Sequence, residues 1–257
     1  MKRLTIVFTS IILLFSFAFI VSANSNEEAY NWFIKKRKGE CPEFPKEARI
    51  VDSYGGIYTD KSENGVREKR IYLTFDAGYE NGNIEKIAKV MKDEGVKGSF
   101  FILSNLVFKN AELVKKLSID GHLICNHTSN HKDMTKLTEG EIKDNINRLT
   151  ALCEERTGVK ISPYFRFPEG KYSEKALKAV KELGYTSVFW SVAYADWDNG
   201  KQPSEEFALN TLISQLHPGA IILLHPTSKT NAAIIKEFIV RAKSEGYVFS
   251  TLDYFGK

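Results

Sequence analysis

Ionisable side chains recur at one kind of position in this chain, beside the point where a short apolar segment ends. Asp76, His127 and His225 each follow such a segment, Arg166 lies near the end of another, and Asp196 lies in the turn after a fifth. Carboxylates, imidazoles and a guanidinium are the groups that proteins use for general acid and base catalysis. If the fold brings them together, they form a candidate active site.

Each of these side chains has a structural alternative when it is taken alone. Asp76 could cap a helix, and His225 could be a hydrogen-bonded core histidine. Arg166 and Asp196 could form a structural ion pair. The repetition at successive apolar segments favours the catalytic interpretation, because a parallel α/β fold brings the carboxyl ends of its strands to one face.

His127 and His131 are spaced for a shared metal ion. Two imidazoles four residues apart lie on one side of a helical turn, within reach of the same ion. The pattern is not HExxH, because position 128 is Thr, and this excludes the zinc-peptidase arrangement with its adjacent glutamate base. HxxxH alone is a weak signal.

The elements that must position these groups alternate between short β-rich segments and amphipathic ones. Strands are predicted over residues 71–75, 98–103, 122–126, 163–167, 186–190, 220–224 and 247–250. Between them, apolar residues recur three and four apart, as in Ile84, Ile87 and Met91, which predicts helices. Strands that alternate with helices form a parallel sheet. An open doubly wound sheet and a closed or distorted barrel both fit, and both place chemistry at the carboxyl ends of the strands.

Composition and charge exclude several classes of protein. The 257 residues are 43% hydrophobic with only 7 Pro, which excludes a disordered chain or a collagen-like repeat. The absence of GxGxxG after the first predicted strand and of GxxxxGK[ST] anywhere argues against nucleotide binding. The net charge of +4 falls to +2 without residues 1–23, so no nucleic-acid partner is expected. No stable protein partner is predicted.

Residues 1–23 have the layout of a secretory signal peptide. Lys2 and Arg3 precede an apolar run that ends in Val21-Ser22-Ala23. The run spans 18 residues, so a retained membrane anchor is the alternative. The prediction is export across the cytoplasmic membrane with cleavage.

The rest of the chain divides into a leader and a domain. Residues 24–69 are polar and aperiodic, and they predict an irregular N-terminal leader. Its basic run at 35–38 is expected to be a solvated surface, with contact to an anionic cell-wall polymer as the alternative. Residues 70–257 form the predicted catalytic domain.

The cysteines indicate no disulfide framework. Cys41, Cys125 and Cys153 allow at most one disulfide, and none lies in a CxxC pair that would indicate a zinc thiolate or thioredoxin-like site. Cys125 lies in an apolar stretch and is expected to be a buried, unreactive thiol.

Five motifs, in order, resemble those of the polysaccharide deacetylases with a NodB homology domain, carbohydrate esterase family 4. They are Thr74–Gly78, His127–His131, Arg166–Gly170, Asp196-Trp197 and Leu223–His225. The resemblance runs from about residue 70 to residue 252, and five ordered motifs are highly specific. It implies a distorted (β/α) barrel of about seven parallel strands with its groove at their carboxyl ends.

The resemblance implies a catalytic role for four residues in the hydrolysis of an acetamido group. Asp76 is the implied general base that activates the attacking water, and Arg166 keeps it ionised, since a guanidinium lowers the pKa of a nearby carboxyl. His225 is the implied general acid that protonates the leaving amine. Asp196 would stabilise its imidazolium form.

The resemblance also implies substrate-binding and metal-binding residues. Leu223 and Trp197 would line the acetyl pocket and its rim, and Tyr79 is a further substrate-binding candidate. His127 and His131 are the implied metal ligands.

Position 77 departs from the family pattern. Most members have a second Asp there that joins the two histidines on the metal, whereas Ala77 has no ligand atom. A catalytic zinc usually has three protein ligands and a water. A divalent ion, zinc or similar, is therefore expected to bind weakly, with Asp76 or water in the third position.

A closer resemblance is to the delta-lactam-biosynthetic branch of the family. It is carried by Phe75–Gly82, Phe189–Ala193 with Asp196-Trp197, Trp32-Phe33 and His217–Ala220. That branch removes acetyl groups from muramic acid on the way to the muramic δ-lactam of spore cortex. The implied partner is a peptidoglycan glycan strand, the implied substrate is N-acetylmuramic acid lacking peptide, and the implied location is the cell wall or the forespore intermembrane space.

Two alternatives remain open from the residues. One is a deacetylase of N-acetylglucosamine in peptidoglycan or chitin-like chains. The other, which Ala77 allows, is a catalytically weak or inactive glycan-binding module.

Overall fold

The computed structural model describes residues 28–257. The predicted signal peptide, and with it the choice between cleavage and a retained anchor, lies outside the described residues. Within residues 28–257, no helix combines the length and the apolar character needed to cross a bilayer.

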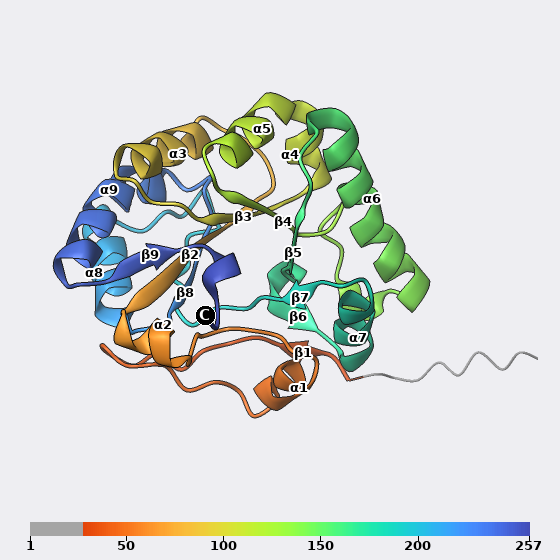
Figure 1. Cartoon of the computed structure of the whole chain (residues 1–257), viewed down its shortest axis with the longest axis horizontal. Helices are drawn as coiled ribbons and strands as arrows, with labels where there is room; N and C mark the ends of the chain where they lie inside the picture. Colours follow the sequence, from red (N-terminus) through yellow and green to blue (C-terminus); the bar gives the residue numbers. More distant parts are fainter. Residues whose placement is uncertain (1–27) are drawn as a thin grey trace, which may run out of the picture.

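Seven parallel strands form the central sheet (Figure 1). They are β2 (Arg70–Ala77), β3 (Ser99–Ile102), β4 (Leu123–Asn126), β5 (Ser162–Phe165), β7 (Thr186–Ser187), β8 (Ile221–Leu224) and β9 (Val248–Ser250). Their order is β7-β5-β4-β3-β2-β8, and β9 pairs with the first residues of β2, beside β8. All seven predicted strands are present; β7 is shorter than predicted, since it covers only Thr186–Ser187 of the expected 186–190.

The sheet is curled into a half-barrel, and the chain after β7 spans its open side. Val192 in this segment forms a parallel bridge with Ile222 of β8. The backbone N–H groups of Ser191 and Val192 both donate to the carbonyl of Ile221, at 2.9 and 3.1 Å. These bonds connect the two edges of the sheet, so the barrel interpretation is confirmed and the open doubly wound sheet is excluded.

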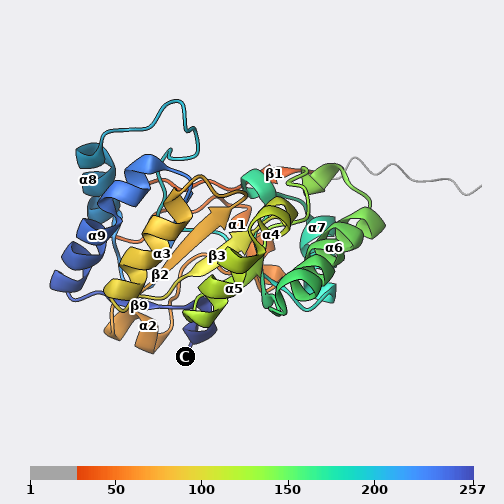
Figure 2. The same ribbon diagram turned by 90° about the horizontal axis from the view of Figure 1, so that it is seen from above.

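Helices cover the outside of the curled sheet, from α8 and α9 across α3, α4 and α5 to α6 and α7 (Figures 1 and 2). They are α3 (Asn83–Asp93), α4 (Ser104–Lys109), α5 (Ala111–Ile119), α6 (Glu139–Thr157), α7 (Glu174–Glu182), α8 (Glu205–Gln215) and α9 (Lys229–Ser244). Three short 3₁₀ turns are η1 (Met134–Lys136), η2 (Pro168–Gly170) and η3 (Leu252–Tyr254).

The apolar stripe of α3 illustrates how these helices are held. Ile84, Ile87 and Met91 recur at helical spacing and are fully buried in the main core. Each such side chain contributes about 1.5–3 kcal/mol by leaving water. The helix ends because Gly95 takes a left-handed conformation, with φ +65°, that a side chain would disfavour.

The N-terminal segment contains short regular elements and is fixed to the barrel. Its elements are β1 (Tyr30–Asn31), which pairs with β6 (Lys171–Tyr172), α1 (Ala48–Ser53) and α2 (Glu63–Arg67). The Trp32 side chain is buried, and its Nε1 donates to the Trp190 carbonyl at 2.9 Å. The segment predicted as an irregular leader therefore holds a strand and two helices, each too short for sequence periodicity to reveal.

The three cysteines are free thiols. Cys125 is fully buried, and burial raises the pKa of its thiol far above the usual value. The expectation of an unreactive thiol in the sheet is confirmed by its burial, because a thiol that cannot ionise is a poor nucleophile.

Candidate active site

The carboxyl ends of the strands open into a cavity of about 740 Å³. Asp76, His131, Leu223, His225 and Trp197 line it. These residues come from β2, from the loop after β4, from β8 and from the loop after β7. The structure therefore brings together residues that the sequence placed at separate strand ends.

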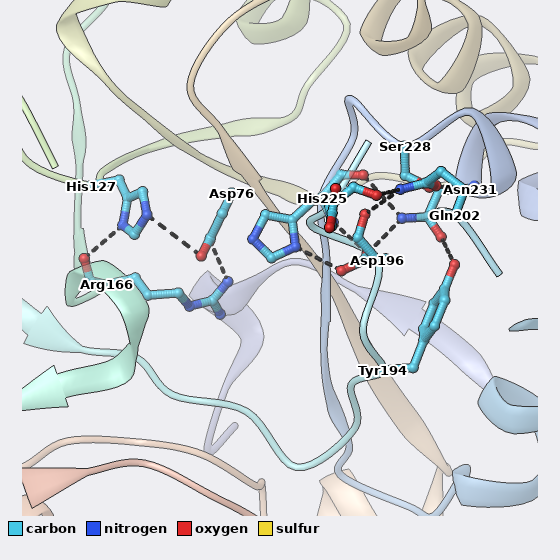
Figure 3. Close-up of polar contacts among 10 residues, drawn as sticks. Asp76, His127, Arg166, Tyr194, Asp196, Gln202, His225, Ser228 and Asn231 are labelled. Atoms are coloured by element: carbon cyan, nitrogen blue, oxygen red, sulfur yellow. Dashed lines mark hydrogen bonds and ion pairs between the residues drawn. The ribbon is translucent and has the colours of Figure 1, made fainter. Parts of the chain in front are cut away.

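Asp76 is the penultimate residue of β2 and lies beside a fully buried arginine. Arg166 Nη1 donates to Asp76 Oδ1 at 2.8 Å, and the two side chains are 0% and 9% exposed. Figure 3 shows Asp76 between Arg166 and His127, whose Nε2 lies 3.6 Å from Asp76 Oδ2. The first carboxylate oxygen is therefore held by the guanidinium, and the second faces an imidazole.

The Arg166 guanidinium is itself fixed on several sides. Its Nη2 donates to Thr74 Oγ1 at 2.9 Å, and its Nε donates to the Val188 carbonyl at 3.1 Å. The Thr74 hydroxyl donates in turn to the Ile222 carbonyl at 2.7 Å. The Phe101 ring lies 4.1 Å from the guanidinium carbon. A buried charge with this many partners is tolerated and keeps one geometry.

Opposing effects act on the pKa of Asp76. Burial raises the pKa of the carboxyl, but the charge of Arg166, followed by the imidazoles of His127 and His225, outweighs burial and lowers the pKa below its usual value. The carboxylate is therefore ionised and able to accept a proton at neutral pH.

His225 lies on the other side of the cavity in a second charged group. Its Nδ1 lies 2.7 Å from Oδ1 of Asp196, and its backbone N–H donates to Asp196 Oδ2 at 2.7 Å. Asn231 Nδ2 donates to the same Oδ2 at 2.6 Å, and the Tyr194 hydroxyl donates to the Asn231 amide oxygen. Figure 3 shows the His225 ring between Asp76 and Asp196.

The pair of His225 and Asp196 favours the protonated ring. Burial lowers the pKa of His225, but the hydrogen bond to Asp196 and the charges of Asp196 and Asp76 outweigh burial and raise the pKa above 6.5. Asp196 is 1% exposed, so its charge is poorly screened. With Nδ1–H bound to Asp196, the proton on Nε2 is directed away from Asp196.

Side chains that the sequence analysis did not identify hold the loop of Asp196. Gln202 Nε2 donates to the carbonyls of Asp196 and Asp198 at 2.9 and 2.8 Å. The Ser228 hydroxyl donates to the Gln202 amide oxygen. Ser228 is also the N-cap residue of α9. A serine before a predicted helix is a recognisable capping signal, and it was the one sequence signal that pointed to any of these side chains.

His127 and His131 lie together at the end of β4. Their ring centroids are 4.9 Å apart with an interplanar angle of 70°. His127 Nδ1 lies 2.8 Å from the Arg166 carbonyl, which fixes the ring and directs Nε2 toward Asp76. A backbone carbonyl on one imidazole nitrogen is the usual support for a metal ligand on the other.

The loop that carries these histidines is held in an unusual conformation. Thr128 and His131 have φ angles of 78° and 57°, a region that non-glycine residues rarely adopt. Thr128 N–H donates to Asn126 Oδ1 at 2.9 Å, and Ser129 N–H donates to Asn145 Oδ1 at 2.7 Å. Backbone strain held by surrounding hydrogen bonds is common at functional sites.

The donor atoms suit a weakly held divalent ion. The 3.6 Å between His127 Nε2 and Asp76 Oδ2 is too long for a hydrogen bond, but two ligands of one tetrahedral ion lie about 3.4 Å apart. Ala77 supplies no donor, and within residues 28–257 no group of three or more His, Cys, Asp or Glu side chains forms a ready metal site. The site therefore offers a divalent ion two imidazoles, and either water or Asp76 as a further ligand.

The predicted substrate-binding residues occupy different positions. Leu223 is buried in the cavity wall, and Trp197 lines the cavity with 66% of its surface exposed. Tyr79 is not among the residues that line the cavity: it is 45% exposed, and its hydroxyl accepts a hydrogen bond from Asn199 Nδ2 at 2.6 Å. The structure thus places Tyr79 beside the loop of Asp196, outside the pocket itself.

Comparisons with known proteins agree with this architecture. A family model described as polysaccharide deacetylase matches residues 63–188. The peptidoglycan-N-acetylmuramic acid deacetylase PdaA of Bacillus subtilis is 38% identical over 228 residues, which cover 88% of this chain and 85% of the relative. The peptidoglycan-N-acetylglucosamine deacetylase PgdA of Listeria monocytogenes is 30% identical over 185 residues, which cover 72% of this chain and 38% of the relative.

Solved structures show the same fold. The structure of Bacillus subtilis PdaA, a family 4 carbohydrate esterase, superposes with a TM-score of 0.84 at 37% identity, covering 89% of this chain and 97% of that one. A family 4 carbohydrate esterase from Bacillus anthracis superposes with a TM-score of 0.73 at 32% identity, covering 89% and 96%. The chain therefore belongs to the polysaccharide deacetylases of carbohydrate esterase family 4, hydrolases of N-acetyl amide bonds.

Proposed function

We propose that this protein removes the acetyl group from N-acetylmuramic acid in peptidoglycan strands that lack peptide. The observation that carries the proposal is the pair of opposed groups on one cavity, Asp76 with Arg166 and His225 with Asp196. The 38% identity to PdaA, a muramic acid deacetylase by name, supports the choice of sugar.

Asp76 is proposed to act as the general base. Its Oδ1 is engaged by Arg166, so Oδ2 is the oxygen that accepts a proton from the attacking water. The lowered pKa of Asp76 means that the base is ionised at neutral pH. The water oxygen then bonds to the acetyl carbon and produces a tetrahedral oxyanion.

His127 and His131 are proposed to hold a divalent cation beside the base. Members of the family are generally metal-dependent. When bound, such an ion polarises the acetyl carbonyl and makes water a stronger nucleophile at neutral pH. The Arg166 carbonyl would keep the His127 ring oriented toward that position.

His225 is proposed to act as the general acid. Its Nε2 proton passes to the amine nitrogen as the carbon–nitrogen bond breaks, which releases acetate and leaves the free amino sugar. Asp196 holds Nδ1–H and stabilises the imidazolium before the transfer. Buried Leu223 would contact the acetyl methyl group, and the exposed Trp197 ring would contact the sugar at the rim.

The setting proposed for this reaction is outside the cytoplasmic membrane. Peptidoglycan lies there, and the layout of residues 1–23 as a signal peptide or anchor would deliver the domain. Deacetylation leaves an amine beside the lactyl carboxyl of muramic acid, the two groups that condense to form the δ-lactam of spore cortex. We therefore place the reaction before lactam closure.

Acetate release from three polymers tests the proposal. Peptide-free glycan strands, intact peptidoglycan and a chitooligosaccharide are each incubated with the chain and a range of divalent ions, and the products are analysed by mass. We expect acetate from the peptide-free strands, with the mass loss on muramic acid. Loss confined to glucosamine would favour the N-acetylglucosamine alternative, and saturable binding with no acetate would favour the binding module.

A further inference from the structure

One wall of the cavity is formed by the N-terminal segment rather than by the barrel. Ile34 and Lys36 line the cavity together with Asp76 and His225. The segment is fixed nearby, since Trp32 N–H donates to the Gly170 carbonyl at 2.9 Å. A lysine from outside the five family motifs therefore faces the reacting centre.

The local backbone explains why Lys36 faces the cavity and its neighbours do not. Lys35 forms an antiparallel bridge with Glu43, with backbone N–H to carbonyl distances of 2.9 and 3.1 Å in the two directions. In extended chain alternate side chains share a face, so Ile34 and Lys36 point one way and Lys35 the other. The Lys35 ammonium accordingly lies 3.1 Å from the Glu43 carboxylate.

Lys36 differs from the other charged groups at the cavity because its charge has no ion-pair partner in the part of the chain that the structure describes. Asp76 is paired with Arg166, and the Glu169 carboxylate is 2.6 Å from the Lys171 ammonium. Among the described residues that line the cavity, Lys36 is the one lysine or arginine. Lys36 is an exposed residue, and partial burial lowers the pKa of its ammonium.

We infer that Lys36 binds the carboxylate of the lactyl group on muramic acid, and so selects peptide-free muramic acid as the substrate. This inference rests on the proposed function. The lactyl ether is at the sugar carbon next to the one that bears the acetamido group, so a carboxylate there enters the same cavity as the reacting amide. N-acetylglucosamine has only a hydroxyl at that carbon, and an attached peptide converts the carboxylate into a neutral amide.

Lys36 thereby provides one physical reason for two preferences. A charge-assisted hydrogen bond forms only with the free acid. Both competing sugars lack the carboxylate and gain nothing from the ammonium. The sequence predicted the basic run at 35–38 as a solvated surface. Within it, Lys35 and Arg37 are paired with Glu43, whereas Lys36 lines the cavity.

The test uses two peptide-free glycan strands that differ at the lactyl group alone, one with the free carboxylate and one with its neutral methyl amide. For the native chain we expect kcat/KM to be about tenfold higher on the free acid, and K36Q to abolish this preference. K36R should retain most of it. K38Q, which changes the same basic run, should behave as the native chain, because Lys38 is not among the residues that line this cavity. K36Q should lose far less kcat/KM on the methyl amide than on the free acid.

Two kinetic results would overturn the inference: an equal loss of kcat/KM in K36Q on both strands, or no loss of kcat/KM on either. Titration calorimetry of the same strands with the chain carrying Asp76→Asn gives the ratio of Kd values without turnover. A tenfold Kd ratio with no acetate release by the native chain would count against the proposed function alone. Acetate release with equal Kd values would count against Lys36 alone.

Discussion

Replacing Asp196 with asparagine should remove the ability of His225 to donate a proton at neutral pH. Asp196 accepts hydrogen bonds from the His225 ring, the His225 backbone and Asn231, at 2.7, 2.7 and 2.6 Å. An asparagine has the same shape but no charge, and one of its two positions becomes a donor. The carboxylate that favours the imidazolium is lost while burial of the ring remains.

The size of the effect can be taken from another histidine of this chain. Burial of His122 outweighs the charge of Asp120 and lowers the pKa of the ring to about 4, so about one ring in a thousand is protonated at pH 7. The His225 side chain is 27% exposed and therefore less desolvated than His122. We expect kcat/KM of D196N to fall by about a hundredfold at pH 7, within the range for loss of a general acid.

The assay is acetate release as a function of pH, with D198N as the matched control. Asp198 lies in the same loop, and its side chain accepts from the Gly200 N–H rather than from His225. Because the pKa of His225 is raised in the native chain, its activity should persist above pH 6.5 and decline only at higher pH. In D196N the decline should begin at lower pH. A D196N profile that superposes on the native one would refute the assigned role of Asp196.

Three further predictions concern stability and metal. R166M should lower the free energy of unfolding by about 3–5 kcal/mol, measured by urea denaturation, because it leaves a buried carboxylate unpaired; a loss below about 1 kcal/mol would contradict the buried ion pair. G219A should be destabilised far more than G82A, since a Cβ at Gly219 would lie 1.9 Å from the Asp60 carbonyl oxygen and one at Gly82 meets nothing within 4 Å; equal melting temperatures would contradict the close approach. Dialysis against a chelator should abolish acetate release and excess divalent ion should restore it, whereas full activity in chelator would exclude a metal role.

The strands and the ionisable side chains of the candidate site were predictable from the sequence because each leaves a local signal. A buried parallel strand is a short apolar run, and a charged residue directly after it is conspicuous, as at Asp76 and His225. Their convergence follows from the rule that parallel strands share one carboxyl edge. The structure shows this convergence at one cavity.

The residues that hold the site in place were not predictable in the same way. Tyr194 and Asn231 act through hydrogen bonds to residues far apart in the sequence, and their types are common in any chain. Asn231 lies in the first turn of α9, where sequence alone indicates no more than the start of a helix. The position of Lys36 was likewise hidden, because it depends on a two-residue bridge that periodicity cannot detect.

The most direct test of the account is the release of acetate from peptide-free glycan strands by the native chain and by D76N, in the presence of a divalent ion. D76N removes the counter-charge of the buried Arg166 and should be less stable than the native chain. The guanidinium keeps its hydrogen bonds to Thr74 and to the Val188 carbonyl, and a melting curve establishes that the variant is folded at assay temperature. We predict that the native chain releases acetate from muramic acid and that D76N loses at least about a thousandfold in kcat/KM. Acetate release by a folded D76N chain at the native rate would contradict it.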